Sequence, residues 1–165
     1  MPLLEAALAK RPDDTAAWEA KGFALGQLAR GGEALAAFGT ALAREPRRES
    51  TLVGAAHLAA RGGRVEDAIA YWRRAIKINP WRPDYQAELA PLYFKSRDWR
   101  AAAAACRETL RLDPTNITVR KLLVRCELHL RHVEAARREL QALLGFDPPD
   151  RDDLLHWLTV LSRPQ

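Results

Sequence analysis

The chain has little cysteine, no long apolar run and no recognisable leader at its start. Only two cysteines occur among 165 residues, which excludes a disulfide-rich scaffold and leaves the redox compartment open. No stretch approaches the roughly 18 apolar residues of a membrane-spanning helix. Residues 1–5 do not begin a secretion signal. We therefore expect no membrane segment and favour a cytoplasmic location, although a mature or excised fragment would look the same.

Sequence signatures of catalysis are also missing. There is no glycine-rich phosphate loop, no nucleophile elbow and no carboxylate pair placed for acid and base roles. Cys126, His129 and His132 have the spacing of a metal site, but residues three apart drift by about 60° around a helix. Cys106 is expected to be a buried small hydrophobe, and His57 has no acidic neighbour in sequence to make it a base. We expect no enzyme activity, no cofactor and no metal.

Helix-forming residues dominate the composition. The protein is 48% hydrophobic and 28% charged, and its commonest residues, alanine, leucine, arginine and glutamate, are good helix formers. The net charge of +5 is compatible with acidic partners. Acidic and basic residues are interspersed along most of the sequence, so the charge is a weak indicator of nucleic-acid binding.

Five prolines recur at a spacing of 34 residues: Pro12, Pro46, Pro80, Pro114 and Pro148. A fixed period of this length is typical of a stacked array of helix hairpins. When each proline is set at position 32 of a unit, the sequence divides into four full units: 15–48, 49–82, 83–116 and 117–150.

Equivalent positions in the four units carry similar residues. Position 20 is always alanine, as close approach of two helices requires: Ala34, Ala68, Ala102 and Ala136. Position 24 is always apolar: Phe38, Trp72, Cys106 and Leu140. This spacing predicts that the second helix of each unit buries one face.

Helix-breaking residues mark the expected turns. Gly31-Gly32 and Gly62-Gly63 are predicted to form the turns within the first two units. The residue before each repeated proline is pushed out of the helical region, so each second helix should end at about position 30. Three residues are placed to cap the helices that follow them: Asp14, Asn116 and Asp150.

The residues at these repeat positions resemble the pattern of the tetratricopeptide repeat family. That pattern has Trp at position 4, Leu at 7, Gly at 8, Tyr at 11, Ala at 20, Phe at 24, Ala at 27 and Pro at 32 of each unit. The first unit matches six of these eight positions, through Trp18, Gly22, Ala34, Phe38, Ala41 and Pro46. The resemblance implies an all-α, right-handed superhelical solenoid of antiparallel helix hairpins over a single domain, 1–165. In it, residues 1–14 supply the second helix of a partial repeat, and residues 151–165 form a capping helix.

Both terminal helices are expected to carry apolar surface. Leu4, Ala7 and Leu8 would normally pack on a first helix that is absent from the sequence. The last helix has an inward stripe, with Trp157 expected to be buried, and a further two apolar residues widen that stripe: Leu155 and Val160. We interpret the sequence either as a segment of a larger protein or as a protein that self-associates through these helices. Trp81, in a turn between units, is a candidate exposed contact, and local packing against the turn is the alternative interpretation.

The resemblance also implies that the first helices line a concave groove for a partner. The residues predicted to face it are Glu19, Phe23, Gln27, His57, Arg61, Phe94, Lys95, Lys121, Arg125 and His129. Lys121 and Arg125 lie four apart on one helical face and are placed to receive carboxylates or phosphates of an extended peptide. Ordinary solvated side chains are the alternative interpretation of the charged members.

We therefore predict a non-catalytic scaffold that binds a protein or peptide, with an acidic segment as one option. The family's chaperone-tail clamp is not matched, because its positions hold Glu19, Phe23, Gly54, Asp84 and Glu88. Two alternatives stay open: a helical-repeat binder of single-stranded RNA, and a regulatory or spacer arm of a larger enzyme. The 34-residue period and the absence of a basic stripe on every unit argue against RNA.

Overall fold

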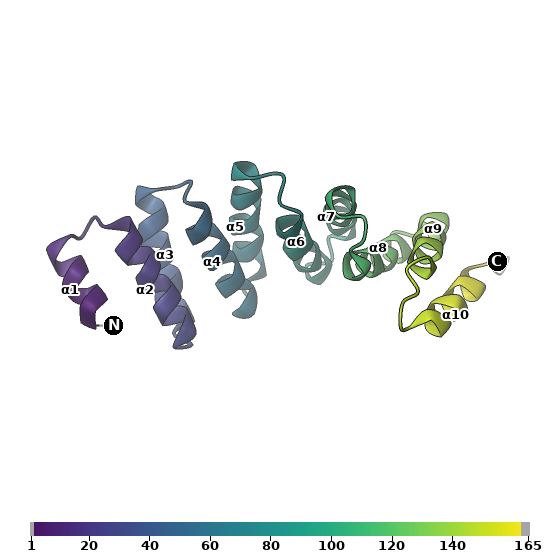
Figure 1. The fold of residues 1–165 in the computed structure, drawn as a ribbon, viewed down its shortest axis with the longest axis horizontal. Helices are drawn as coiled ribbons and strands as arrows, with labels where there is room; N and C mark the ends of the chain where they lie inside the picture. The colour runs from purple at the N-terminus through teal and green to yellow at the C-terminus, as the bar shows by residue number, and fades with distance from the viewer. Residues whose placement is uncertain (1, 163–165) are drawn as a thin grey trace. The chain divides into compact units, whose positions relative to one another are not determined.

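The computed structural model describes residues 2–162, which form ten helices and no strand (Figure 1). The helices are α1 (Pro2–Lys10), α2 (Thr15–Gln27), α3 (Gly31–Arg44), α4 (Glu49–Arg61), α5 (Val65–Ile78), α6 (Pro83–Lys95), α7 (Trp99–Leu112), α8 (Ile117–His129), α9 (Val133–Leu144) and α10 (Arg151–Leu161). The predicted all-α fold is confirmed.

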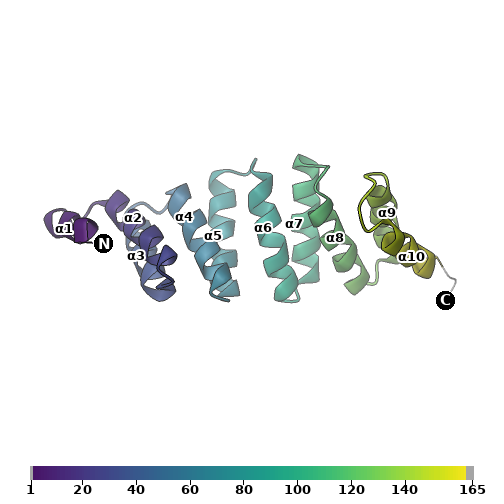
Figure 2. The same cartoon turned by 60° about the horizontal axis from the view of Figure 1, so that its bottom comes forward.

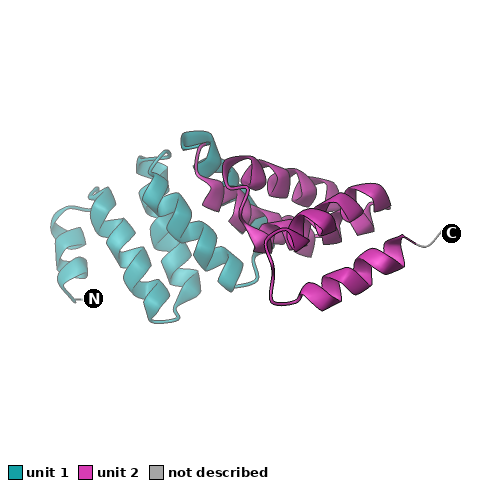
Figure 3. Cartoon of the chain, turned by 45° about the vertical axis from the view of Figure 1, so that its right-hand side comes forward, with its two compact units in different colours: residues 1–80 teal, residues 81–165 magenta. Residues whose placement is uncertain are grey.

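The protein forms two compact units, Met1–Pro80 and Trp81–Gln165, coloured separately in Figure 3. In the first unit α2 pairs with α3 and α4 with α5, while α1 packs on α2. In the second unit α6 pairs with α7 and α8 with α9, and α10 packs on α9. Figure 2 shows the paired helices of each unit side by side. The four predicted hairpins are therefore present, and the single domain over residues 1–165 stays a prediction.

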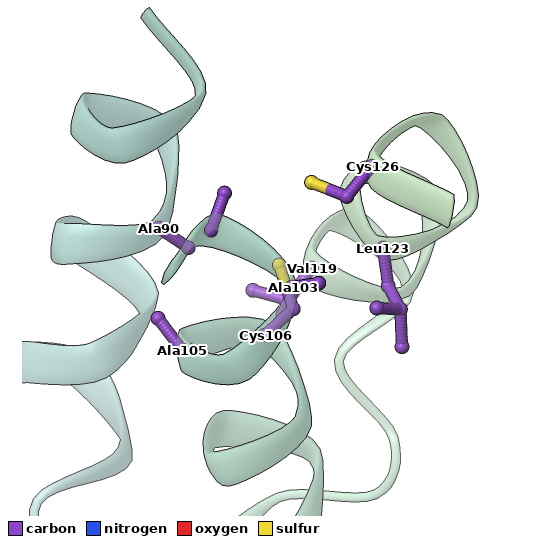
Figure 4. Close-up of a cluster of buried hydrophobic side chains, with 8 residues drawn as sticks. Ala90, Ala103, Ala105, Cys106, Val119, Leu123 and Cys126 are labelled. Carbon is purple, nitrogen blue, oxygen red and sulfur yellow. The ribbon is translucent and has the colours of Figure 1, made fainter. Parts of the chain in front are cut away.

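The alanine column lies in the core of the hairpins. All four alanines of position 20 are fully buried, and so are the larger apolar residues of position 24. Figure 4 shows one of the resulting clusters, in which Cys106 of α7 and Cys126 of α8 lie among Ala90, Val119 and Leu123. A hydrogen bond with Cys126, together with burial, raises the pKa of the Cys106 thiol. Cys106 is thus a packing residue, as predicted.

Each turn within a hairpin has a left-handed residue at position 15. These residues are Ala29, Gly63, Arg97 and Arg131, with φ of 59°, 73°, 62° and 64°. The amide of the next residue donates to a carbonyl five residues earlier in every case, at 2.8–3.0 Å, which closes a Schellman cap. Gly62-Gly63 form their turn as predicted, but the prediction for Gly31-Gly32 was wrong. Gly31 and Gly32 lie in the first turn of α3. The turn is formed two residues before Gly31, where the Schellman cap of α2 places the left-handed residue at Ala29.

The second helix of each hairpin ends shortly before its repeated proline. α3, α5 and α7 end at position 30, as predicted, and α9 ends two residues earlier. Asp14 and Asn116 cap α2 and α8 through bonds from Ala17 N (2.9 Å) and Val119 N (3.0 Å). Asp150 was predicted to cap α10 in the same way, and it does not. Its carboxylate is bound to Lys121 Nζ instead.

The terminal helices differ from the expected pattern at both ends. In α1, Leu8 is buried and Leu4 and Ala7 are half-buried, so less apolar surface is left there than expected, and Leu3 is 87% exposed. Trp157 was predicted to be buried, but 53% of it is exposed, as are parts of Leu155 and Val160. Only Leu154 of α10 is buried, and α10 packs chiefly against α9. Trp81 is 72% exposed, which confirms the prediction for that residue.

Candidate functional site

Four of the predicted groove residues line one cavity in the first unit. Phe23 and Gln27 come from α2, and His57 and Arg61 come from α4. The cavity has a volume of about 170 Å³, and 44% of Phe23 is exposed at it. Its floor consists of Gly22, Gly26, Phe38, Gly54 and Leu58. The sequence brings these side chains together because positions 9 and 13 of successive first helices face the same side.

Two glycines make room for the aromatic rings of this cavity. A Cβ on Gly22 would lie 2.5 Å from the Phe38 ring, and a Cβ on Gly54 would lie 2.7 Å from the Phe23 ring. The Phe23 and Phe38 rings meet edge to face, with centroids 5.0 Å apart. His57 packs edge-on against Trp72 at 4.9 Å. The aromatic wall therefore packs directly on the core beneath it.

Glu19 has a structural role next to this cavity and does not line it. Its carboxylate accepts hydrogen bonds from Arg48 Nε and Nη2 (2.9 and 2.8 Å), from Thr51 Oγ1 (2.8 Å) and from Ser50. Burial opposes ionisation, but these hydrogen bonds and the Arg48 charge prevail and hold the pKa of Glu19 below its ordinary value. The side chain ties α2 to the start of α4.

The second unit gathers the predicted residues Phe94, Arg125 and His129 around Trp99. The Arg125 guanidinium lies 4.5 Å from the centroid of the Phe94 ring, a cation–π contact. His129 stacks on Trp99 with centroids 4.1 Å apart, and Phe94 meets both of these rings edge-on. Sequence reasoning did not assign Trp99 to the groove. Trp99 lies at the start of α7, and its contacts with Phe94 of α6 and His129 of α8 are visible only in the structure. Lys95 is exposed and lines none of the cavities described here.

Lys121 is paired within the protein. Its ammonium donates to both carboxylate oxygens of Asp150, at 2.7 and 2.6 Å, and this bond lowers the pKa of Asp150. Lys121 is therefore not a free cation. Arg125, the other member of the predicted pair, has no carboxylate partner among the described residues.

A second cavity, of about 400 Å³, opens beside Lys121 and Arg125. Its walls are almost wholly apolar and come from three helices: Val124 and Leu128 of α8, Leu140 and Leu143 of α9, and Leu154 and Trp157 of α10. Sequence reasoning missed it, because the columns predicted that the inward stripe of α10 would close over these residues.

A third cavity, of about 330 Å³, lies beside the turn between α3 and α4 and is lined by Pro46, Arg47, Arg74, Lys77 and Ile78. Arg74 Nη2 donates to the Pro46 carbonyl at 2.9 Å. Its cationic residues lie outside the positions that sequence reasoning assigned to a groove.

Family models described as tetratricopeptide repeat match residues 24–83 and 93–155. The chain belongs to the tetratricopeptide repeat family. The TPR repeat-containing thioredoxin TTL4 of Arabidopsis thaliana is 31% identical to it over 100 residues. That match takes in 61% of this chain and 14% of the relative, so the chain spans a small part of that protein's length.

Solved structures show the same fold at low identity. YrrB, described as a TPR protein with an unusual peptide-binding site, superposes with a TM-score of 0.78 at 16% identity, over 96% of this chain and 81% of that one. A tetratricopeptide repeat protein from Parabacteroides merdae gives 0.75 at 20% identity, over 96% and 65%. The first TPR domain of Spaghetti (RPAP3), bound to an HSP90 peptide, gives 0.61 at 16% identity, over 70% and 90%.

Metal-binding clusters and membrane-spanning helices do not occur in the described part of this tetratricopeptide repeat protein. Across residues 2–162, no three histidine, cysteine, aspartate or glutamate side chains gather closely enough to hold a metal ion. None of the helices in that range has the length and apolar character needed to cross a membrane.

Proposed function

We propose that this protein is a non-catalytic protein-interaction scaffold that binds a peptide or protein segment on the face formed by its first helices. The convergence of Phe23, Gln27, His57 and Arg61 on one cavity carries the proposal, because these residues come from two repeats and were selected by their position in the repeat. Family membership supports it, since stacked repeats of this kind commonly present extended binding surfaces.

The chemistry of this cavity indicates what kind of segment fits. The Phe23 ring offers an apolar wall, and Arg61 offers a cation without a carboxylate partner among the described residues. A segment carrying an apolar side chain beside an acidic one satisfies both groups. The cluster of Phe94, Arg125 and His129 offers a similar combination in the second unit. We therefore propose that the partner segment is acidic.

The partner differs from a chaperone tail. The carboxylate-clamp positions of the family hold Glu19, Phe23, Gly54, Asp84 and Glu88 in this protein. Glu19 is moreover engaged by Arg48 and Thr51. These positions lack the lysine and arginine of such a clamp, so we propose an internal segment of the partner as the ligand.

A second proposal is that the repeats serve as an arm of a larger protein. The Arabidopsis relative supports it, because the matched repeats make up only 14% of that protein. Self-association through the exposed Leu3, Leu155 and Val160 is a further proposal. Light scattering at two concentrations tests it: a mass that does not rise with concentration contradicts self-association.

Affinity capture followed by mass spectrometry tests the scaffold proposal. The tagged wild-type protein is compared with Phe23→Ala/Arg61→Glu and with Arg64→Glu, which makes the same charge change at an exposed residue of the same unit outside the cavity. We expect partners to be lost from the first variant and kept by the second, with helicity unchanged in both. Retention of the same partners by the double variant would contradict this site. Salt-sensitive retention of single-stranded RNA would favour the nucleic-acid alternative instead.

A further inference from the structure

In both units, an aromatic ring of one first helix is laid against the next first helix. In the first unit α2 contacts α4, and the Phe23 ring lies over Gly54 so closely that a Cβ there would be 2.7 Å away. In the second unit α6 contacts α8, and the Phe94 ring lies against Arg125 and His129. The two rings occupy positions 9 and 12 of their repeats.

The seam between α8 and α10 has no such ring. The residues of α8 at positions 9 and 12 are Arg125 and Leu128, and Arg125 is directed to Phe94 on the preceding first helix. α8 and α10 also make no approach comparable to that of α6 and α8. The cavity of about 400 Å³ opens at this place.

The interior of this cavity is apolar, and part of its lining belongs to the buried core. Leu140 and Leu143 are fully buried beneath it and belong to the core cluster that also contains Val124 and Leu154. Trp157 forms one wall and is 53% exposed. The volume falls in the range of about 300–1,000 Å³ typical of ligand sites, and an apolar pocket with a few polar groups at its edge is the usual form of such sites.

The polar edge of the cavity carries one unneutralised positive charge. Lys121 is neutralised by Asp150, with both carboxylate oxygens bound. Arg125 touches the Phe94 ring and has no acidic partner among the described residues. A guanidinium in contact with an aromatic face keeps its remaining N–H groups available to a carboxylate.

We propose that this cavity receives an aromatic side chain of a partner segment, and that an acidic group next to that side chain pairs with Arg125. The partner's ring takes the place that Phe23 and Phe94 fill in the other two seams. The inference rests on the proposed scaffold function and names the chemistry of the partner segment. The charge at the edge selects an acidic segment over a purely apolar one.

The test uses 3-phenylpropanoate, which carries a phenyl ring and a carboxylate, and the neutral 3-phenylpropanamide of the same shape. Binding to the protein of 165 residues is followed by NMR of the tryptophan indole signals, with the Trp157 signal assigned from a Trp157→Phe variant. We expect saturable binding of the anion with a shift of the Trp157 signal, and about tenfold weaker binding of the amide.

Three variants locate the site. Val124→Phe fills the cavity and should weaken the binding of 3-phenylpropanoate at least about tenfold by steric exclusion, and Arg125→Gln should weaken it to the level of the amide. Arg138→Gln, which removes an exposed cation of α9 that lies outside the cavity, should leave it unchanged. If Val124→Phe does not fold, as judged by circular dichroism, Leu128→Phe makes the same test.

Several results would overturn the inference. They are no Trp157 response to the anion, equal binding of the amide, or unchanged binding in the filled variants. A dimer that Val124→Phe dissociates would assign the cavity to a second copy and would also overturn it. None of these results bears on partner capture through Phe23 and Arg61, so failure here is distinguishable from failure of the scaffold proposal.

Discussion

The carboxylate of Glu127, on α8, is bound by the guanidinium of Arg107, on the preceding helix α7. Glu127 is only 1% exposed, while Arg107 reaches it from the surface. The second carboxylate oxygen lies 2.9 Å from Nδ1 of His132, at the start of α9. One acidic side chain thus links three consecutive helices, at a repeat position that holds Leu25, Ala59 and Tyr93 in the other units.

Removal of the Arg107 guanidinium should be costly, because it leaves a buried carboxylate short of a charged donor. We expect Arg107→Gln to lower the free energy of unfolding by about 1.5–3 kcal/mol. Arg111→Gln is the matched control, since Arg111 forms an exposed pair with Glu108 and should cost less than about 1 kcal/mol. Urea unfolding measures both variants. Equal losses would show that the tie between α7 and α8 contributes little.

The stability contributed by Glu19 should depend on pH in a defined direction. Because the pKa of Glu19 is lowered in the folded protein, its ionised form stabilises the fold above the ordinary carboxyl pKa of about 4.3. That contribution is lost as pH falls through the lowered value. We expect Glu19→Gln to be less stable than the wild type at pH 7, with the difference vanishing in acid. Urea titrations between pH 7 and 3 check this, and a constant difference would contradict it.

The buried alanine column limits side-chain size. Ala102 is fully buried between α6 and α7, and Ala104, two residues later on α7, is exposed. We expect Ala102→Leu to destabilise the protein by about 1–3 kcal/mol through overpacking. Ala104→Leu should change stability by less than about 0.5 kcal/mol. A thermal melt of the two variants distinguishes them, and a neutral Ala102→Leu would mean that the helices can separate at little cost.

Two helical glycines of the first hairpin should respond in opposite directions to alanine. Gly22→Ala would place a Cβ 2.5 Å from the Phe38 ring, so the ring or the helix must move. A Cβ added to Gly39, on α3, would meet no atom within 4 Å, and Gly39→Ala should stabilise the protein by about 0.5–1 kcal/mol through helix propensity. Chemical unfolding of both variants is the measurement. A stabilising Gly22→Ala would contradict the close packing of Phe38 on α2.

The repeat period allowed most of the fold to be predicted. Once Pro46 and its equivalents fixed the register, the buried columns and the ends of α3, α5 and α7 followed from helical geometry. The error at Gly31-Gly32 arose because glycine content was used to place a turn, whereas the backbone places it at Ala29. The sequence carries no direct signal of the φ that a residue adopts under tertiary constraint.

The candidate site was less predictable than the fold. Repeat positions placed Phe23, His57 and Arg61 on one face, and these residues line one cavity, because that requires only the helix period and parallel stacking. Their role in binding stays a prediction. The pairing of Lys121 with Asp150 depends on the path of the backbone after α9, and no pattern encodes it. The cavity beside Trp157 depends on how closely α10 approaches α8, and the repeat pattern does not specify that distance.

The left-handed turns have a consequence for how the hairpins are assembled. Ala29, Arg97 and Arg131 adopt a backbone conformation that is unfavourable for residues with a Cβ, whereas Gly63 adopts it freely. In the unfolded state the reversal at Gly63 is therefore locally accessible, while the other three become favourable only when their flanking helices dock. We therefore expect the reversal between α4 and α5 to cost the unfolded chain less backbone free energy than the other three reversals.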